Sequence, residues 1–211
     1  KAIRYTECQA KANNIEVDMA TGTGWPFGGP WVPINEAACK AVFVDTLVNI
    51  KTKIKDIAFA VPNKEKSIAT LQKAMEFKSD IKGKKRVIAL YISRTRQMVK
   101  RAAPGGEGYV IDHFDKNAVM HYLAHIDSAF NASNTPYPHT FFNDSYEVFG
   151  ADWTPTLLDE FAKRRGYKLE TCFDKLLDGD SKTLSDYRET LSDMLLENFT
   201  NQWTAWAHSH G

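Results

Sequence analysis

Carboxylates and aromatic rings gather where three short strands of this 211-residue chain are expected to end. The first strand ends at Asp18 and a Gly/Trp loop, the second at Asp112-His113, and the third at Asn143-Asp144, followed by Glu147. Glu107 lies in a glycine-rich turn just before the second strand. In parallel α/β folds, ligands bind at the carboxyl ends of strands. Carboxylates accept hydrogen bonds from sugar hydroxyls or hold a cation, and the rings of Trp25 and Trp153 can stack on sugar C–H faces. The combination indicates a carbohydrate site.

Two carboxylates flanking a bond can also hydrolyse a glycoside, although three of the acidic residues have a plainer structural explanation. Asp115 is better explained as a helix N-cap, Asp144 could cap the turn after its strand, and Asp18 could order its loop. Glu147 follows a strand end without an evident capping role. Enclosure by Tyr146, Phe149 and Trp153 would desolvate its carboxyl and favour the protonated form that a general acid needs.

Several other sites are excluded by the spacing of their motifs. Gly22-Thr-Gly-Trp-Pro26-Phe-Gly28 is GxGxxxG with an interrupting proline, and no GxxxxGK[ST] phosphate loop occurs. His121 and His125 have the spacing of a zinc helix, but Tyr122 stands where the glutamate should be. Three widely spaced cysteines do not indicate a disulfide framework. No apolar run approaches the roughly 18 residues of a membrane span.

Charge is distributed unevenly along the chain. Residues 31–104 hold 16 Lys+Arg and 6 Asp+Glu, a net of +10, and the remainder holds 11 and 20, a net of −9. This asymmetry predicts a basic β-rich insertion at 31–104, between a first strand and loop at 1–30 and βα units at 105–211. Lys51-Thr-Lys53-Ile-Lys55 is interpreted as a solvated strand face, with a surface for an acidic polysaccharide as the alternative. Without interleaved aromatics, no nucleic-acid partner is expected.

Secondary structure is expected to alternate between strands and helices outside the insertion. Strands are predicted at 39–50, 54–61, 86–93 and 96–101, with no assignment for 64–77. Asp115 should cap a helix whose apolar face is Val119, Tyr122, Leu123, Ile126 and Phe130. A second helix should start at Thr154-Pro155 and end at Gly166, and a third should open at Ser185. This alternation predicts parallel strands and an α/β architecture.

Long strings of the chain are similar to one enzyme family. Asp18-Met-Ala-Thr-Gly-Thr-Gly-Trp-Pro-Phe-Gly-Gly-Pro-Trp31, Phe142-Asn-Asp-Ser-Tyr-Glu147 and Asp186-Tyr-Arg-Glu-Thr-Leu-Ser-Asp resemble glycoside hydrolase family 106, the bacterial α-L-rhamnosidases. The resemblance covers 15–31 and 101–211 and leaves the basic insertion largely unmatched. It implies a partial (β/α)8, TIM-like barrel with a small β-rich insertion, truncated at both ends and completed by the rest of a larger catalytic domain.

The resemblance also implies a function. It implies inverting hydrolysis of terminal α-L-rhamnosides in plant polysaccharides, Ca2+ dependence with unassigned ligands, and a periplasmic or extracellular location. By position Glu147 is the general acid, and its partner carboxylate lies beyond Gly211, so the isolated chain should be inactive. The substrate-binding residues are then Asp18, Trp25, Glu107, Asp112, His113, Asn143, Asp144 and Trp153. The alternative is a non-catalytic fragment that binds a rhamnose-containing glycan.

Overall fold

The computed structural model describes residues 1–143 and 146–210, which fall into two compact units. Unit 1 consists of Lys1–Ala38, Arg96–Phe149 and Leu195–Gly211, and unit 2 consists of Cys39–Thr95 and Gly150–Met194. Each unit is assembled from segments that are far apart in the sequence. The three-part division drawn from charge stays a prediction.

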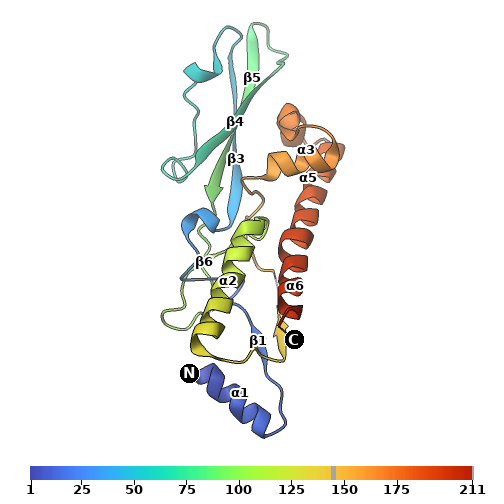
Figure 1. Cartoon of the computed structure of the whole chain (residues 1–211). Helices are drawn as coiled ribbons and strands as arrows, with labels where there is room; N and C mark the ends of the chain where they lie inside the picture. Colours follow the sequence, from blue (N-terminus) through green and yellow to red (C-terminus); the bar gives the residue numbers. More distant parts are fainter. Residues whose placement is uncertain (144–145, 211) are drawn as a thin grey trace. The chain divides into compact units, whose positions relative to one another are not determined.

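Unit 1 combines helices with two small sheets. Its elements are α1 (Ala2–Ala12), β1 (Asp18–Ala20), β2 (Gly28–Gly29), η1 (Ile34–Glu36), β6 (Tyr109–Val110), α2 (Lys116–Ser133), β7 (Thr140–Phe142), the π-helix η4 (Leu195–Asn201) and α6 (Gln202–His208). β1 pairs in parallel with β7, and β2 pairs antiparallel with β6. In Figure 1, α2 and α6 lie side by side, whereas α1 has no buried residue.

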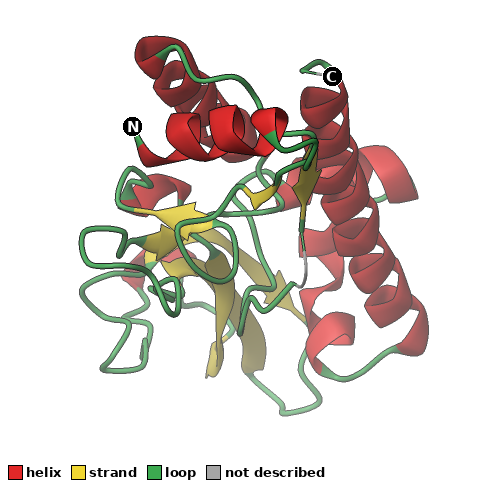
Figure 2. Cartoon of the chain, turned by 90° about the horizontal axis from the view of Figure 1, so that it is seen from below, coloured by secondary structure: helices red, strands yellow, loops and turns green. Residues whose placement is uncertain are grey.

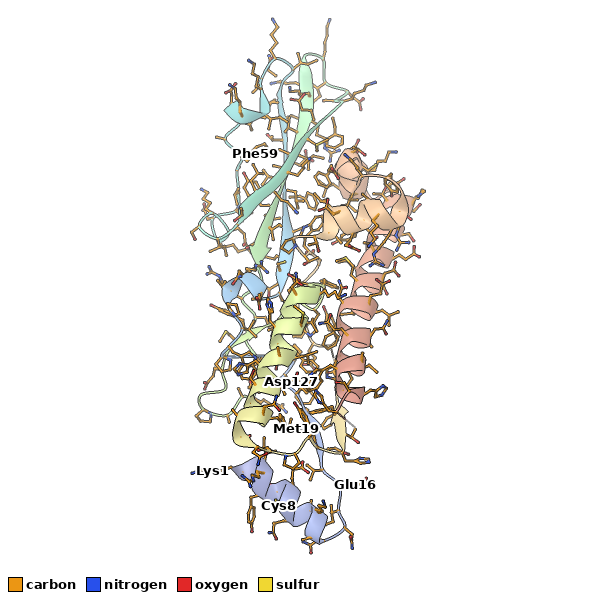
Figure 3. All side chains as sticks on the ribbon, in the orientation of Figure 1. Lys1, Cys8, Glu16, Met19, Phe59 and Asp127 are labelled. Atoms are coloured by element: carbon orange, nitrogen blue, oxygen red, sulfur yellow. The ribbon has the colours of Figure 1, made fainter. Side chains whose placement is uncertain are left out.

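Helix α2 forms the core of unit 1, as its sequence predicts. The Asp115 carboxylate accepts hydrogen bonds from the backbone N–H groups of Asn117 and Ala118, which confirms the N-cap. All five residues of the predicted apolar face are buried. They pack with Phe27, Val32 and Phe199, and Met19 on β1 covers the cluster (Figure 3). Burial of this apolar face is what holds α2 against the loops that precede it.

Unit 2 is built on one three-stranded antiparallel sheet in the order β3-β5-β4. The strands are β3 (Cys39–Asn49), β4 (Thr70–Phe77) and β5 (Lys84–Arg94). The central strand β5 buries four consecutive residues, 87–90, whereas each edge strand exposes several side chains. Strand β4 occupies part of the segment to which the sequence assigned no structure. Figure 2 shows these strands in yellow among long loops.

The helices of unit 2 are α3 (Leu157–Arg165), the 3-10 helix η3 (Leu169–Cys172), α4 (Phe173–Leu177) and α5 (Ser181–Met194). Gly166 ends α3 with φ of 75°, as expected, because glycine adopts the left-handed conformation without strain. Two predicted helix starts are wrong. Thr156, not Thr154, is the N-cap of α3. Asp180 precedes the last helix and accepts the Thr183 N–H at 2.9 Å, so that helix starts four residues before Ser185.

The predicted barrel is wrong. Within residues 1–143 and 146–210, the strands form two two-stranded sheets and one three-stranded sheet, in a mixed α/β fold. A barrel requires neighbouring strands to be parallel around a closed ring, and only β1 and β7 pair in parallel among the described strands. Alternation of strands and helices in sequence therefore did not determine which strands pair.

Other strand predictions are also corrected. Residues 54–61 contain the 3-10 helix η2 (Ile54–Asp56) and no strand, so Lys51, Lys53 and Lys55 are exposed on a loop and a helical turn. Residues 96–101 form only isolated bridges at Met98 and Lys100. No helix in the described part of the chain is both long and apolar enough to cross a membrane.

Candidate functional site

The parallel pair β1–β7 brings two predicted site segments together in unit 1. Ala20 is in register with Phe142, so the loop after β1 and Asn143 after β7 leave the same edge. A shallow hollow with a cavity volume of about 20 Å³ opens there, and Trp25 and Asn143 line it together with Pro26 and Phe27. The shared edge follows directly from parallel pairing, in which carboxyl ends meet on one side.

The loop after β1 is held in place by hydrogen bonds from elsewhere in unit 1. The Tyr122 hydroxyl lies 2.8 Å from the Thr21 carbonyl oxygen and 3.0 Å from that of Gly28, so one proton is shared between the two ends of the loop. Burial raises the pKa of Tyr122 and keeps it a donor. The Thr23 hydroxyl donates to the Gly106 carbonyl at 2.6 Å. The loop that carries Trp25 is thus braced at both ends and in the middle.

Asp112 and His113 lie inside unit 1, with exposures of 1% and 2%. The Asp112 carboxylate accepts the Phe114 N–H at 3.1 Å. His113 Nδ1 lies 3.0 Å from the Ile111 carbonyl oxygen, so it carries the proton and Nε2 is the acceptor of a neutral ring. Burial lowers the pKa of His113 to about 4, and the bond to Ile111 offsets only part of this effect. His113 is therefore neutral at pH 7.

Tyr146 packs edge-on against this histidine. The ring centroids of His113 and Tyr146 are 5.0 Å apart with an interplanar angle of 87°. Desolvation raises the pKa of Tyr146, and the nearby Asp112 carboxylate raises it further. Although 39% of the residue stays exposed, its ring packs against that of His113. Tyr146 therefore connects the buried Asp112-His113 pair to the segment that carries Glu147.

Glu147 is held by side chains from residues 97 and 100. Gln97 Nε2 donates to the Glu147 carbonyl oxygen at 2.7 Å, and the Phe149 N–H donates to Gln97 Oε1 at 2.7 Å. Lys100 Nζ lies 3.4 Å from Glu147 Oε2 and 4.5 Å from the centroid of the Phe149 ring. The Glu147 side chain is 46% exposed, so the expected aromatic enclosure is not formed within unit 1.

The remaining predicted site residues lie in different surroundings. Asp18 is the exposed first residue of β1, so it lies at the amino end of that strand and not at the carboxyl end. Glu107 is exposed and accepts the Gly105 N–H at 2.8 Å, which braces its own turn. Trp153 is fully buried in unit 2, where its indole donates to Gln72 Oε1 at 3.0 Å. A sugar cannot stack on Trp153 in this conformation. Asp144 lies outside the described residues.

The calcium that the family resemblance implies finds no ligand set in the part of the chain that the structure describes. No group of three or more His, Cys, Asp or Glu side chains comes together there to hold a metal ion. Calcium requires several oxygen ligands at once, and Asp18, Glu107 and Asp112 do not provide a common cluster. Calcium dependence stays a prediction and enters no step below.

A comparison with protein families identifies the chain. The sequence model of the α-L-rhamnosidases, glycoside hydrolase family 106, matches residues 70–211. The chain belongs to this α-L-rhamnosidase family. The match confirms the family and covers the strings that contain Glu147 and Asp186, whereas the Asp18–Trp31 string lies outside it. It also includes residues 70–104, which the resemblance left largely unmatched, and with them Gln97 and Lys100.

A solved structure supports the same fold. The chain is similar to the rhamnosidase from Novosphingobium sp. PP1Y with a TM-score of 0.78 and 14% sequence identity. The similarity covers 99% of this chain but 39% of that one, so the chain spans well under half the length of the rhamnosidase it matches. A search of curated proteins finds no match.

Sequence reasoning did not find Gln97 and Lys100. Both lie in the segment 96–101, which was interpreted as a strand of the basic insertion, whereas the structure places it in unit 1. Their contacts reach 50 and 47 residues along the chain. No periodicity or short motif signals a side-chain contact of that separation. A basic residue next to a family-matched glutamate is recognisable only once the chain is folded.

Proposed function

We propose that this chain supplies the general acid of an inverting α-L-rhamnosidase that cleaves terminal α-L-rhamnosides of plant polysaccharides outside the cytoplasm. The observation that carries the proposal is the family match over residues 70–211, which includes Glu147. In unit 1 this glutamate is accessible to a substrate and is held by contacts at its backbone and its carboxylate. The Trp25 loop and Asn143 provide an aromatic ring and an amide on the β1–β7 edge for a sugar ring.

The chemistry assigned to Glu147 is proton donation to the glycosidic oxygen as its bond to the anomeric carbon breaks. In an inverting enzyme a second carboxylate activates water on the opposite face, about 6.5–9.5 Å away. Lys100 Nζ lies 3.4 Å from the Glu147 carboxylate, and because both side chains are nearly half exposed, this ion pair is weak.

The test is hydrolysis of an aryl α-L-rhamnoside by the protein expressed from its full reading frame. Glu147→Gln removes the acidic proton and should lower kcat by about 10²- to 10⁴-fold. Glu76→Gln is the matched control, because Glu76 is also exposed and also pairs with a lysine, Lys85, at 2.7 Å. It should keep wild-type turnover. NMR of the first-formed sugar should show the inverted anomer.

Two results would contradict the proposal. Equal turnover of wild type and Glu147→Gln would remove Glu147 from the acid role. If the wild type binds rhamnosides without cleaving them, the chain is a non-catalytic carbohydrate-binding fragment. The aromatic ring and the amide at the β1–β7 edge would also suit that function.

A further inference from the structure

Two hydrogen bonds from the side chain of Gln97 hold the backbone segment that carries Glu147. The Gln97 amide donates to the carbonyl of Glu147 and accepts the N–H of Phe149, both at 2.7 Å. A primary amide offers one planar donor and acceptor set, like a peptide group. Gln97 therefore binds the carbonyl of one residue and the N–H of the second residue after it, as a partner strand does in a parallel ladder.

Gln97 is itself fixed to the interior of unit 1. The backbone carbonyl of Gln97 accepts the N–H of Val110 at 3.0 Å, and Val110 is fully buried. Three residues further on, the backbone of Lys100 exchanges two hydrogen bonds with that of Trp25, at 2.8 and 3.0 Å. One short segment thus holds the Trp25 loop through its backbone and the Glu147 segment through the Gln97 side chain.

The contact made by Lys100 is weaker than this pair of bonds. Its ammonium lies 3.4 Å from the Glu147 carboxylate, with side-chain exposures of 49% and 46%. Exposed ion pairs of this kind contribute little to stability, because solvent screens them. Both Gln97 bonds act on the backbone that directly follows the Glu147 Cα, at the Glu147 carbonyl and the Phe149 N–H, so they fix the stretch of chain from which the Glu147 side chain leaves.

We propose that Gln97 is a positioning residue that holds Glu147 in register with the Trp25 loop for proton donation; this inference rests on the function proposed above. A general acid must lie within hydrogen-bond distance of the oxygen that it protonates. Displacement of a catalytic group by about 1 Å can cost about 100-fold in rate. Loss of the Gln97 bonds therefore lowers kcat, while sugar contacts elsewhere leave KM unchanged.

The first measurement is amide hydrogen exchange by NMR on the chain, which needs no activity. Gln97→Met keeps the length of the side chain and removes both hydrogen bonds, so exchange at the Phe149 amide should accelerate at least tenfold. Gln97→Glu keeps the acceptor for that amide, which should stay protected. Gln202→Met is the matched control, because it removes a different glutamine bond of unit 1, to the Lys116 carbonyl at 3.2 Å. It should leave Phe149 unchanged.

The second measurement is kinetic, on the protein from its full reading frame. Gln97→Met should lower kcat by about 10- to 100-fold with KM within about twofold. Unchanged Phe149 exchange, or unchanged kcat, in Gln97→Met would overturn the inference. If Glu147→Gln lowers kcat as expected and Gln97→Met leaves kcat unchanged, only the positioning role fails. If Glu147→Gln retains turnover, the proposed function fails and the positioning role fails with it.

Discussion

The buried histidine of unit 1 should make folding stability depend on pH. Burial lowers the pKa of His113 to about 4, against an ordinary value of 6.5. Between these values the unfolded chain binds a proton that the folded chain does not, so stability is lost as pH falls through this window. The shift predicts a loss of about 2 kcal/mol by pH 5 and about 3 kcal/mol by pH 4, relative to pH 7.

The perturbation that isolates this effect is His113→Asn. Asparagine does not titrate, and its amide can still donate toward the Ile111 carbonyl, which His113 Nδ1 contacts at 3.0 Å. Guanidinium unfolding would be followed at pH 7, 5 and 4 by tryptophan fluorescence, which reports mainly on unit 1 because every tryptophan except Trp153 belongs to it. Between pH 7 and 4 the wild type should lose about 3 kcal/mol more than the variant.

A packing variant separates titration from lost contacts. Phe199 lies against His113 with ring centroids 4.6 Å apart, so Phe199→Leu loosens the same cluster without removing an ionisable group. It should reduce the free energy of unfolding by a similar amount at each pH and keep the wild-type slope. If wild type and His113→Asn lose stability equally on acidification, the reasoning from burial is refuted.

Two further predictions concern the framework of unit 1. Asp115→Ala removes the acceptor for two backbone N–H groups and should cost about 1 kcal/mol, measured by denaturant unfolding; an unchanged midpoint would contradict the cap. Gly108→Ala would place a Cβ 1.9 Å from backbone atoms of Gly29, where β2 meets β6, and should cost about 3 kcal/mol or more. At Gly105, where φ is 85°, an added Cβ meets open space, so Gly105→Ala should lower the free energy of unfolding by only about 1 kcal/mol. Equal losses of stability in the two glycine variants would refute the steric argument.

Local patterns predicted the elements whose stability depends on near neighbours in the chain. The cap at Asp115, the five-residue apolar face of α2 and the left-handed Gly166 all follow from residues within a few turns. The long strands β3 and β5 were expected almost at their observed bounds, because alternating and continuous apolar runs are local signals. For the helices, the predictions that were wrong concern only the first residue of α3 and of α5, where several neighbouring residues can act as the N-cap.

Pairing could not be predicted in the same way. The family resemblance implied a barrel and strand-helix alternation outside the insertion predicted parallel strands. Among the described strands outside the insertion, β1 and β7 pair in parallel but β2 and β6 pair antiparallel, and only register and burial across the sheet decide that. The alternating lysines from Lys51 to Lys55 suggested a strand and instead lie on a loop and a 3-10 turn. β propensity reflects packing against neighbours that a short sequence window does not contain.

The sequence by itself determined the family, the capped helix of the core and the loop that carries Trp25. Only the tertiary structure decided which of those residues meet. It placed Asp18 at the wrong end of its strand for a shared site, buried Trp153, and joined Gln97 to Glu147 across 50 residues. The physical reason is that helix caps and apolar periodicity are local interactions. A site is formed by hydrogen bonds and burial between distant segments, whose partners exist only after the chain has folded.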